Sequence, residues 1–172
     1  LGAQVERVIV FGRPNLSRPV TALLSRPGVE VAVVTDAGDY VDPGWRASLV
    51  AGAVSVEPAP PAWLDAWRQA DVARLADVTA VLDAAMGPTG PALARLVVAS
   101  VGGDAVLCLG NSNPIRDADL APVPASPVSV FGNRGLSGID GTISTAMGVA
   151  LATGAPTTLL CGDLAFFHDA GA

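Results

Sequence analysis

The chain alternates short, unbroken apolar runs with longer stretches in which apolar positions recur every three or four residues. Apolar runs of about five to seven residues that end at glycine or polar residues are typical of strands buried on both faces. Stretches of helical spacing that open with Ser or Pro predict helices. The predicted strands are 7–12, 29–35, 105–109, 128–131 and 157–161, with a further short Val/Ala segment at 49–56. The predicted helices are 17–26, 62–85, 91–100 and 139–152.

This alternation predicts an α/β protein built on parallel sheets with helices on both faces. In such sheets, ligands bind beyond the carboxyl ends of the strands. Three loops follow predicted strands and are expected to meet at one edge of a sheet. These loops are 110–117, 132–141 and 162–169.

A change of pattern near the middle of the chain suggests two domains. The sequence Gly-Pro-Thr-Gly at 87–90 interrupts the helical spacing on either side of it. We therefore expect a Rossmann-like α/β domain at 1–86 and a second α/β domain at 87–172.

Composition and charge exclude several classes of protein. Of the 172 residues, 51% are hydrophobic and 15% are charged, which argues against a disordered chain. The formal net charge is −6 and no basic run occurs, so a nucleic-acid-binding protein is not expected. No signal-peptide pattern and no apolar stretch of about 18 residues is visible, so a membrane partner is not expected either. Cys108 and Cys161 lie in apolar runs without a nearby Cys or His, which predicts buried thiols in a reducing, cytoplasmic setting.

Two of the three loops contain residues suited to anions or cations. Asp163 directly follows a buried strand, where a single carboxylate can be a Mg²⁺ ligand or can simply cap the following helix. The loop 132–141 is rich in glycine and precedes a helix, so its backbone N–H groups could face an anion, and Arg134 adds a fixed cation. A tight turn with close helix–sheet packing is the alternative for this loop.

The third loop, 110–117, offers amide, hydroxyl and guanidinium groups within a few residues. Such groups would suit a substrate that carries carboxylates, and they belong to Asn111, Ser112, Asn113 and Arg116. An Asx turn that caps a short helix is the competing interpretation.

Taken together, these motifs resemble the family of 2-succinyl-5-enolpyruvyl-6-hydroxy-3-cyclohexene-1-carboxylate synthases, hereafter the synthase family. The matching residues are Ser112 with Arg116, the string from Asn133 to Gly148, and Gly162 to Leu164. Asn-Arg-Gly-x-Ser-Gly-Ile-Asp-Gly is highly specific for this family among thiamin-diphosphate enzymes. The resemblance covers 107–169, whereas 1–86 resembles the family's central domain only in layout.

The resemblance implies an enzyme of menaquinone biosynthesis. Members of this family decarboxylate 2-oxoglutarate and add the resulting four-carbon carbanion equivalent to isochorismate. The implied cofactors are thiamin diphosphate, which serves as the electron sink, and Mg²⁺ or Mn²⁺. A homodimer or homotetramer is implied for the complete enzyme, and the chain at 87–172 would be the first part of the domain that binds the cofactor's diphosphate.

The resemblance also implies roles for residues that bind the cofactor. Asp163 would be the first metal ligand, with Gly162 and Leu164 beside it, and Leu164 replaces the glycine that is usual in this cofactor class. Gly138 and Ile139 match positions that support the bent cofactor with an apolar side chain.

Ser112, Arg116 and Arg134 match positions that bind substrate carboxylates or hydroxyls. Arg18 is a weaker match, because family members can carry a basic pair there and Arg18-Pro19 supplies one cation; a surface arginine at a helix start is the alternative. His168 is expected to pack or to cap a helix rather than to act as a general base.

Parts of the family pattern are absent from this sequence. They are the domain that supplies the glutamate activating the cofactor, and the asparagines that close the metal motif. We therefore expect a fragment of a longer enzyme, inactive by itself. Two alternatives remain: another thiamin-diphosphate 2-oxoacid decarboxylase or synthase, and a non-catalytic α/β module that binds a small anion.

Overall fold

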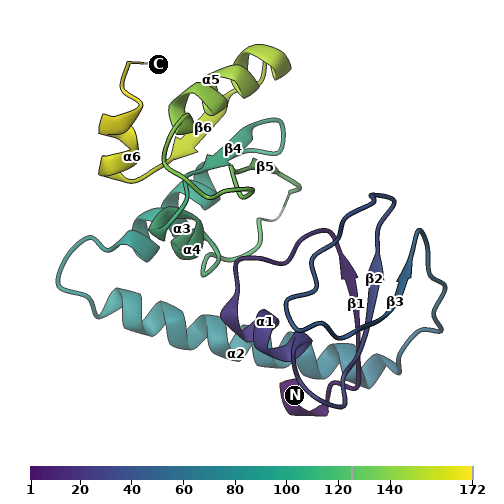
Figure 1. Cartoon of the computed structure of the whole chain (residues 1–172). Coiled ribbons are helices and arrows are strands. Elements are labelled where there is room, and N and C mark those ends of the chain that lie inside the picture. Colours follow the sequence, from purple (N-terminus) through teal and green to yellow (C-terminus); the bar gives the residue numbers. More distant parts are fainter. Residues whose placement is uncertain (125, 172) are drawn as a thin grey trace. The chain divides into compact units, whose positions relative to one another are not determined.

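The computed structural model describes residues 1–124 and 126–171 (Figure 1). The chain divides into two compact units between Asp71 and Val72, inside the helix α2 (Pro61–Asp83). The domain boundary expected from the sequence lies later, after residue 86. The assignment of 1–86 and 87–172 to two domains therefore stays a prediction.

The first unit contains a parallel sheet of three strands in the order β1-β2-β3. The strands are β1 (Arg7–Phe11), β2 (Glu30–Val34) and β3 (Ala47–Ala51), and the helices are η1 (Gly2–Gln4) and α1 (Arg18–Leu24). Ser17 caps α1 by accepting a hydrogen bond from the Val20 N–H at 3.5 Å, and Pro19 lies in the first turn, where no N–H is needed.

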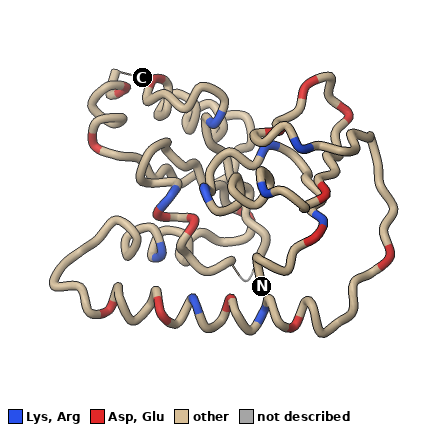
Figure 2. Tube along the Cα trace, turned by 60° about the horizontal axis from the view of Figure 1, so that its bottom comes forward, with Lys and Arg blue, Asp and Glu red and all other residues tan. Residues whose placement is uncertain are grey.

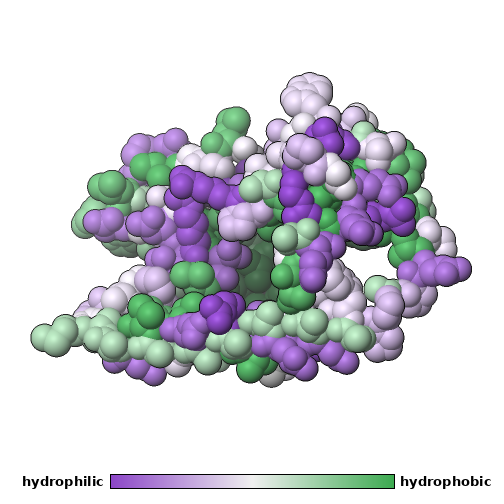
Figure 3. Space-filling model, turned by 90° about the horizontal axis from the view of Figure 1, so that it is seen from below, coloured by the Kyte–Doolittle hydropathy of each residue, from purple (hydrophilic) through white to green (hydrophobic). Residues whose placement is uncertain are grey.

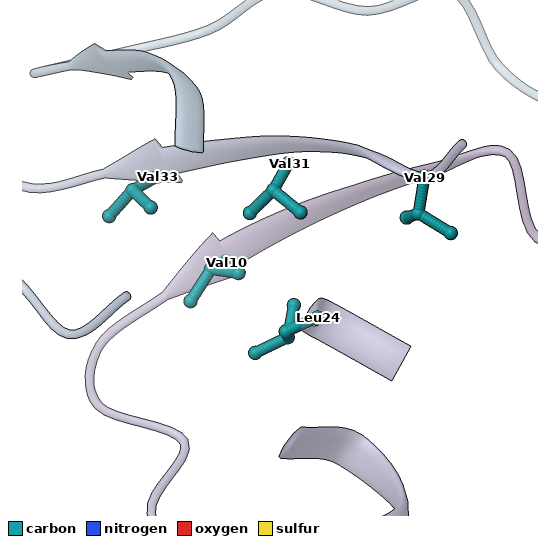
Figure 4. Packing of buried hydrophobic residues seen from close by; sticks show 5 residues of the cluster. All are labelled: Val10, Leu24, Val29, Val31 and Val33. Carbon is teal, nitrogen blue, oxygen red and sulfur yellow. The ribbon is translucent and has the colours of Figure 1, made fainter. Parts of the chain in front are cut away.

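The core of the first unit lies between α1 and the sheet. It consists of Val10, Leu24, Val29, Val31 and Val33. Figure 4 shows Leu24 of α1 opposite the valines of β1 and β2. Alternate residues of a strand face the same side, so Val31 and Val33 both reach α1 from one face of β2. Leu24 and Val33 are each only 1% exposed, so their side chains are removed from water almost completely, which stabilises the unit.

The second unit contains a parallel sheet in the order β5-β4-β6. Its strands are β4 (Val106–Leu109), β5 (Ser129–Phe131) and β6 (Thr157–Leu160). Its helices after α2 are α3 (Gly90–Ser100), α4 (Asn113–Ala118), α5 (Thr142–Thr153) and α6 (Asp163–His168). The central strand β4 is buried along its whole length, as the apolar run predicted.

Helices cover both faces of this second sheet. Leu107 and Leu109 of β4 pack with Val98 of α3, whereas Cys108 on the opposite face packs with Ala146 of α5. This alternation follows from the two-residue period of a strand. The prediction of an α/β protein with parallel sheets is confirmed.

Two predicted elements begin or end elsewhere in the structure. The segment expected at 49–56 forms a strand at Ala47–Ala51, and the residues after it pair with no strand. The helix expected from Ile139 begins at Thr142, because Gly141 at its N-cap has a left-handed backbone with φ of +68°. The remaining predicted strands and helices lie within two residues of the observed ones at each end.

The surface mixes charged and apolar side chains. Figure 2 shows Arg interspersed with Asp and Glu along the described chain. Figure 3 shows hydrophobic side chains reaching the surface among hydrophilic ones. Among the exposed large hydrophobic side chains of the second unit are Leu151 of α5 and Leu164 and Phe167 of α6, which are 84%, 72% and 75% exposed.

Within residues 1–124 and 126–171, no helix combines the length and the apolar character needed to cross a membrane.

Cys108 and Cys161 are both free thiols. Cys108 is fully buried and Cys161 is partly buried, and burial raises the pKa of each thiol. The predicted burial is therefore confirmed fully for Cys108 and partly for Cys161.

Candidate functional site

The three loops singled out from the sequence follow the carboxyl ends of β4, β5 and β6. Because the strands are parallel, these ends lie at one edge of the sheet. The Gly110 N–H, just after β4, donates to the Leu160 carbonyl at the end of β6, with an N···O distance of 2.8 Å. A Cβ at Gly110 would lie 3.1 Å from the Cα of Cys161, and one at Gly132 would lie 3.2 Å from the Leu109 carbonyl oxygen. Glycine therefore lets the three loops approach each other closely.

Asn111 connects the loop after β4 with the loop after β5. It is 7% exposed, and its Nδ2 donates to the carbonyls of Asn133 and Gly138, each at 2.8 Å. Its Oδ1 accepts a hydrogen bond from Nη1 of Arg134 at 3.2 Å. Sequence reasoning noted this amide but did not select it. The signal that could have found it is a polar residue directly after a fully buried strand and a glycine.

Arg134 contacts Asn111, the residue that directly precedes Ser112. Arg134 is partly buried against Asn111, whereas Ser112 and Arg116 are exposed. Ser112 is the N-cap residue of α4 with φ of 72° and ψ of −123°, and its side chain makes no capping hydrogen bond. Arg116 lies in the last turn of the same helix. An unusual backbone at a residue expected to bind substrate is typical of functional sites.

Gly138 and Ile139, expected beside the cofactor, precede α5. The Gly138 carbonyl is held by Asn111, and the Ile139 carbonyl accepts a hydrogen bond from the Thr142 hydroxyl at 3.0 Å. Ile139 is partly buried. The backbone on both sides of this apolar side chain is therefore fixed.

The N-terminus of α5 already holds a carboxylate of the chain itself. Asp169 Oδ2 accepts the backbone N–H groups of Ile143 at 2.6 Å and Ser144 at 2.9 Å, and Oδ1 accepts the Ser144 hydroxyl at 3.2 Å. The pKa of Asp169 is lowered, most of all by the Ser144 N–H. The Ile143 N–H, the Ser144 hydroxyl and nearby His168 lower it further. The sequence left open whether this glycine-rich loop and helix start face an anion or form a tight turn with close helix–sheet packing. The anion that the helix holds is an internal one, from a residue about 25 positions later in the chain.

Asp163 is the first residue of α6 and is exposed. Its Oδ1 accepts the Leu164 N–H at 2.9 Å, and Gly162 is the N-cap. Among residues 1–124 and 126–171, no group of three or more His, Cys, Asp or Glu side chains could enclose a metal ion. Mg²⁺ commonly takes only one or two protein carboxylates and fills its remaining positions with phosphate and water oxygens. An exposed carboxylate at the carboxyl edge of the sheet fits such a site.

His168 closes the last turn of α6. Its Nδ1 lies 3.0 Å from Oδ1 of Asp140, and both side chains are more than half exposed. When protonated, His168 pairs with this carboxylate and complements the helix dipole. The expectation that His168 packs or caps a helix stays a prediction, because this contact is to Asp140, outside α6.

Arg18 lies in the first unit. It is the first residue of α1, directly after the Ser17 cap, and it is exposed. This position corresponds to the alternative of a surface arginine at a helix start, and the suggested substrate contact stays a prediction.

A groove of about 730 Å³ lies elsewhere in the second unit. It is lined mainly by apolar residues of α3 and of the loop after α4, including Leu96, Val98, Pro122 and Val123. None of the predicted site residues lines it. Its size alone therefore does not make it the site of chemistry.

No protein-family model matches the chain, but several curated proteins do. The whole chain is 51% identical to the 2-succinyl-5-enolpyruvyl-6-hydroxy-3-cyclohexene-1-carboxylate synthase of Kineococcus radiotolerans and covers 31% of that protein. It is 44% identical to the synthase of the same name from Arthrobacter sp., with 97% of the chain and 29% of the relative aligned. For the synthase from Nocardioides sp., identity is 44%, with 100% of the chain and 35% of the relative aligned.

The chain thus spans about a third of the length of these curated relatives. The match extends over both units, including the first, for which the sequence motifs offered only a likeness of layout. Over the region that it spans, the chain belongs to the family of 2-succinyl-5-enolpyruvyl-6-hydroxy-3-cyclohexene-1-carboxylate synthases.

Proposed function

We propose that the complete protein decarboxylates 2-oxoglutarate with thiamin diphosphate and adds the four-carbon unit to isochorismate, as a step of menaquinone biosynthesis. The chain described above would supply the central domain and the first part of the domain that binds the cofactor's diphosphate. The observation that carries this proposal is the convergence of three motif-bearing loops at the carboxyl edge of one parallel sheet. The identity to synthases of this name supports it independently.

The residues at this edge fit the cofactor and a divalent cation. Asp163 would bind Mg²⁺ or Mn²⁺, and the backbone of Gly162 and Leu164 would lie beside the diphosphate. The apolar side chain of Ile139, with Gly138 next to it, would support the cofactor. When bound, thiamin diphosphate supplies the electron sink that a 2-oxoacid decarboxylation requires.

Substrate binding would depend on fixed cations. Both substrates carry several negative charges, and a guanidinium group is always protonated and can hold a carboxylate through two hydrogen bonds. Arg134 and Arg116 would bind carboxylates of the substrates, and the Ser112 hydroxyl would bind a carboxylate or hydroxyl near the reacting carbon. Arg18 would contribute from the first unit.

We place the protein in the cytoplasm, as a homodimer or homotetramer that acts on small molecules. The two free thiols, one buried and one partly buried, support a reducing compartment. Exposed apolar residues of α5 and α6, such as Leu151 and Phe167, support a further protein surface packing on these helices.

The proposal is tested by turnover of the complete gene product. We expect 2-oxoglutarate and isochorismate to be consumed together only when thiamin diphosphate and Mg²⁺ are both present. The 172-residue chain assayed alone should be inactive. Consumption of 2-oxoglutarate without any dependence on isochorismate would indicate a different 2-oxoacid decarboxylase instead.

Arginine variants separate these functions further. We expect Arg116→Ala and Arg134→Ala to weaken 2-oxoglutarate or isochorismate binding while cofactor binding stays intact. A protein stabilised by thiamin diphosphate but inactive with every 2-oxoacid would instead be a binding module.

A further inference from the structure

The side chain of Asn111 is placed so that its whole amide takes part in hydrogen bonds. A primary amide has two N–H donors and one carbonyl oxygen. Here Nδ2 donates to two backbone carbonyls, those of Asn133 and Gly138, and Oδ1 accepts from the guanidinium of Arg134. These three partners fix which end of the amide is nitrogen and which is oxygen, because carbonyls only accept and a guanidinium only donates.

The bonds of Asn111 join groups with different proposed tasks. Arg134 is a proposed substrate ligand, whereas the Gly138 carbonyl precedes Ile139, which is proposed to support the cofactor. Asn133 continues the same set of bonds, because its Nδ2 donates to the Thr145 hydroxyl of α5 at 3.0 Å. Asn111 itself directly follows Gly110, whose N–H is bonded to the end of β6.

Because Asn111 is buried, the loss of any one of these hydrogen bonds should destabilise the loops. Asn111 is 7% exposed, so water cannot easily replace a partner that is removed. The hollow that Asn111, Asn133 and Thr145 help to line is only about 10 Å³, which leaves room for about one water molecule at most. The loops after β4 and β5 are therefore packed around this amide.

We propose that Asn111 is a positioning residue that fixes the Arg134 guanidinium and the Gly138 backbone in one arrangement. It makes the loops 110–117 and 132–141, which contain the proposed substrate-binding and cofactor-binding residues, act as one unit. Asn111 need not touch substrate or cofactor for this role. The catalytic part of the inference rests on the function proposed above, whereas the coupling of the two loops does not.

Aspartate at position 111 is the most informative substitution. It has nearly the same shape as asparagine, but it carries no donors when ionised. The carbonyls of Asn133 and Gly138 would then face a carboxylate oxygen, while the bond to Arg134 would become a charge-assisted one. Asn111→Asp should therefore both loosen the loop 132–141 and partly neutralise the cation that a dicarboxylate substrate needs.

Hydrogen–deuterium exchange on the complete gene product tests the coupling without any assumption about activity. We expect Asn111→Ala and Asn111→Asp to raise exchange about fivefold or more in 132–141, with little change in β1. The matched control is Asn113→Asp, an exposed asparagine at the start of α4, which should leave exchange unchanged. Unchanged exchange in 132–141 for both Asn111 variants would overturn the inference.

If both Asn111 variants unfold, Arg134→Ala probes the same bonds from the partner side. It removes one of the three bonds and should raise exchange in 132–141 by a smaller factor. No increase in this variant would overturn the proposed coupling.

Kinetics test the positioning role. Asn111→Asp should raise the KM for 2-oxoglutarate about tenfold, and this effect should largely vanish when Arg134→Ala is already present. Independent, multiplying effects of the two substitutions would refute positioning through Arg134. Absence of turnover in the unsubstituted protein would refute the proposed function instead, and the exchange result would still decide whether Asn111 couples the loops.

Discussion

Backbone strain at Ser112 leads to a prediction that separates stability from function. Ser112 has φ of 72° and ψ of −123°, a region that residues with a Cβ rarely adopt. Such a conformation costs about 1–3 kcal/mol, and glycine would remove that cost. Glycine also gives the unfolded chain more freedom, which opposes the gain by about 0.5–1 kcal/mol relative to alanine. We therefore expect Ser112→Gly to be more stable than Ser112→Ala by about 1 kcal/mol.

Urea unfolding of the two variants, followed by far-ultraviolet circular dichroism, measures this difference. With a urea dependence of about 1–3 kcal/mol per molar, the midpoint of Ser112→Gly should lie about 0.3–1 M higher. Ser129 in β5 provides a matched control, because glycine in a strand lowers stability relative to alanine. There the order of the two variants should be reversed.

The same pair of variants probes function. Both remove the hydroxyl, so in the complete gene product both should weaken substrate binding to a similar extent, whatever their difference in stability. If Ser112→Ala were as stable as Ser112→Gly, the backbone at this position would not be strained and the reasoning would fail. If both variants bound substrate like the unsubstituted protein, Ser112 would have no contact with it.

Two further predictions concern the helices and loops around the site. Folding lowers the pKa of the Asp169 carboxyl. The ionised carboxylate therefore stabilises the fold above the pKa that Asp169 has in the unfolded chain, and this stabilisation is lost as the pH falls through its lower pKa in the folded chain. Asp169→Asn should therefore show a smaller loss of urea midpoint between pH 7 and pH 3 than the unsubstituted chain, and an equal loss would contradict the cap. Gly110→Ala should lower stability by about 1–3 kcal/mol, because the new Cβ would meet the Cα of Cys161 at 3.1 Å and the backbone there must move. Gly148 in α5 is the matched control, because nothing lies within 4 Å of a Cβ added there. Gly148→Ala should raise the free energy of unfolding in urea by about 0.5–1 kcal/mol. If both variants lost a similar amount of stability, the close approach at Gly110 would be contradicted.

The strands were predictable because burial on both faces leaves continuous apolar runs. β4 is the plainest case, since each of its four residues is buried. The segment after Ala51 was misjudged because it is also Val- and Ala-rich, and composition does not show whether a partner strand is present. The start of α5 was misplaced because the left-handed backbone at Gly141 depends on the turn around it.

The site was predictable as a set of loops but not as a set of contacts. Parallel topology places the ends of β4, β5 and β6 together, and the motifs mark Ser112, Arg134 and Asp163 within those loops. The bonds of Asn111 and Asp169 join residues more than 20 positions apart in sequence, so no local pattern reveals them. For this reason the sequence showed that the start of α5 could face an anion, but not that Asp169 provides it.

Binding of thiamin diphosphate through a divalent cation at Asp163 is the property on which the proposed activity most directly depends. Calorimetric titration of the complete gene product measures it, with and without Mg²⁺, for the unsubstituted protein and for Asp163→Asn. Asp104→Asn is a matched control, because Asp104 is an exposed residue just before β4, at the amino end of the strand. We expect Mg²⁺-dependent binding that Asp163→Asn weakens by at least about tenfold and Asp104→Asn leaves unchanged. Binding that is independent of Mg²⁺, or equally tight in Asp163→Asn, would contradict the proposed site.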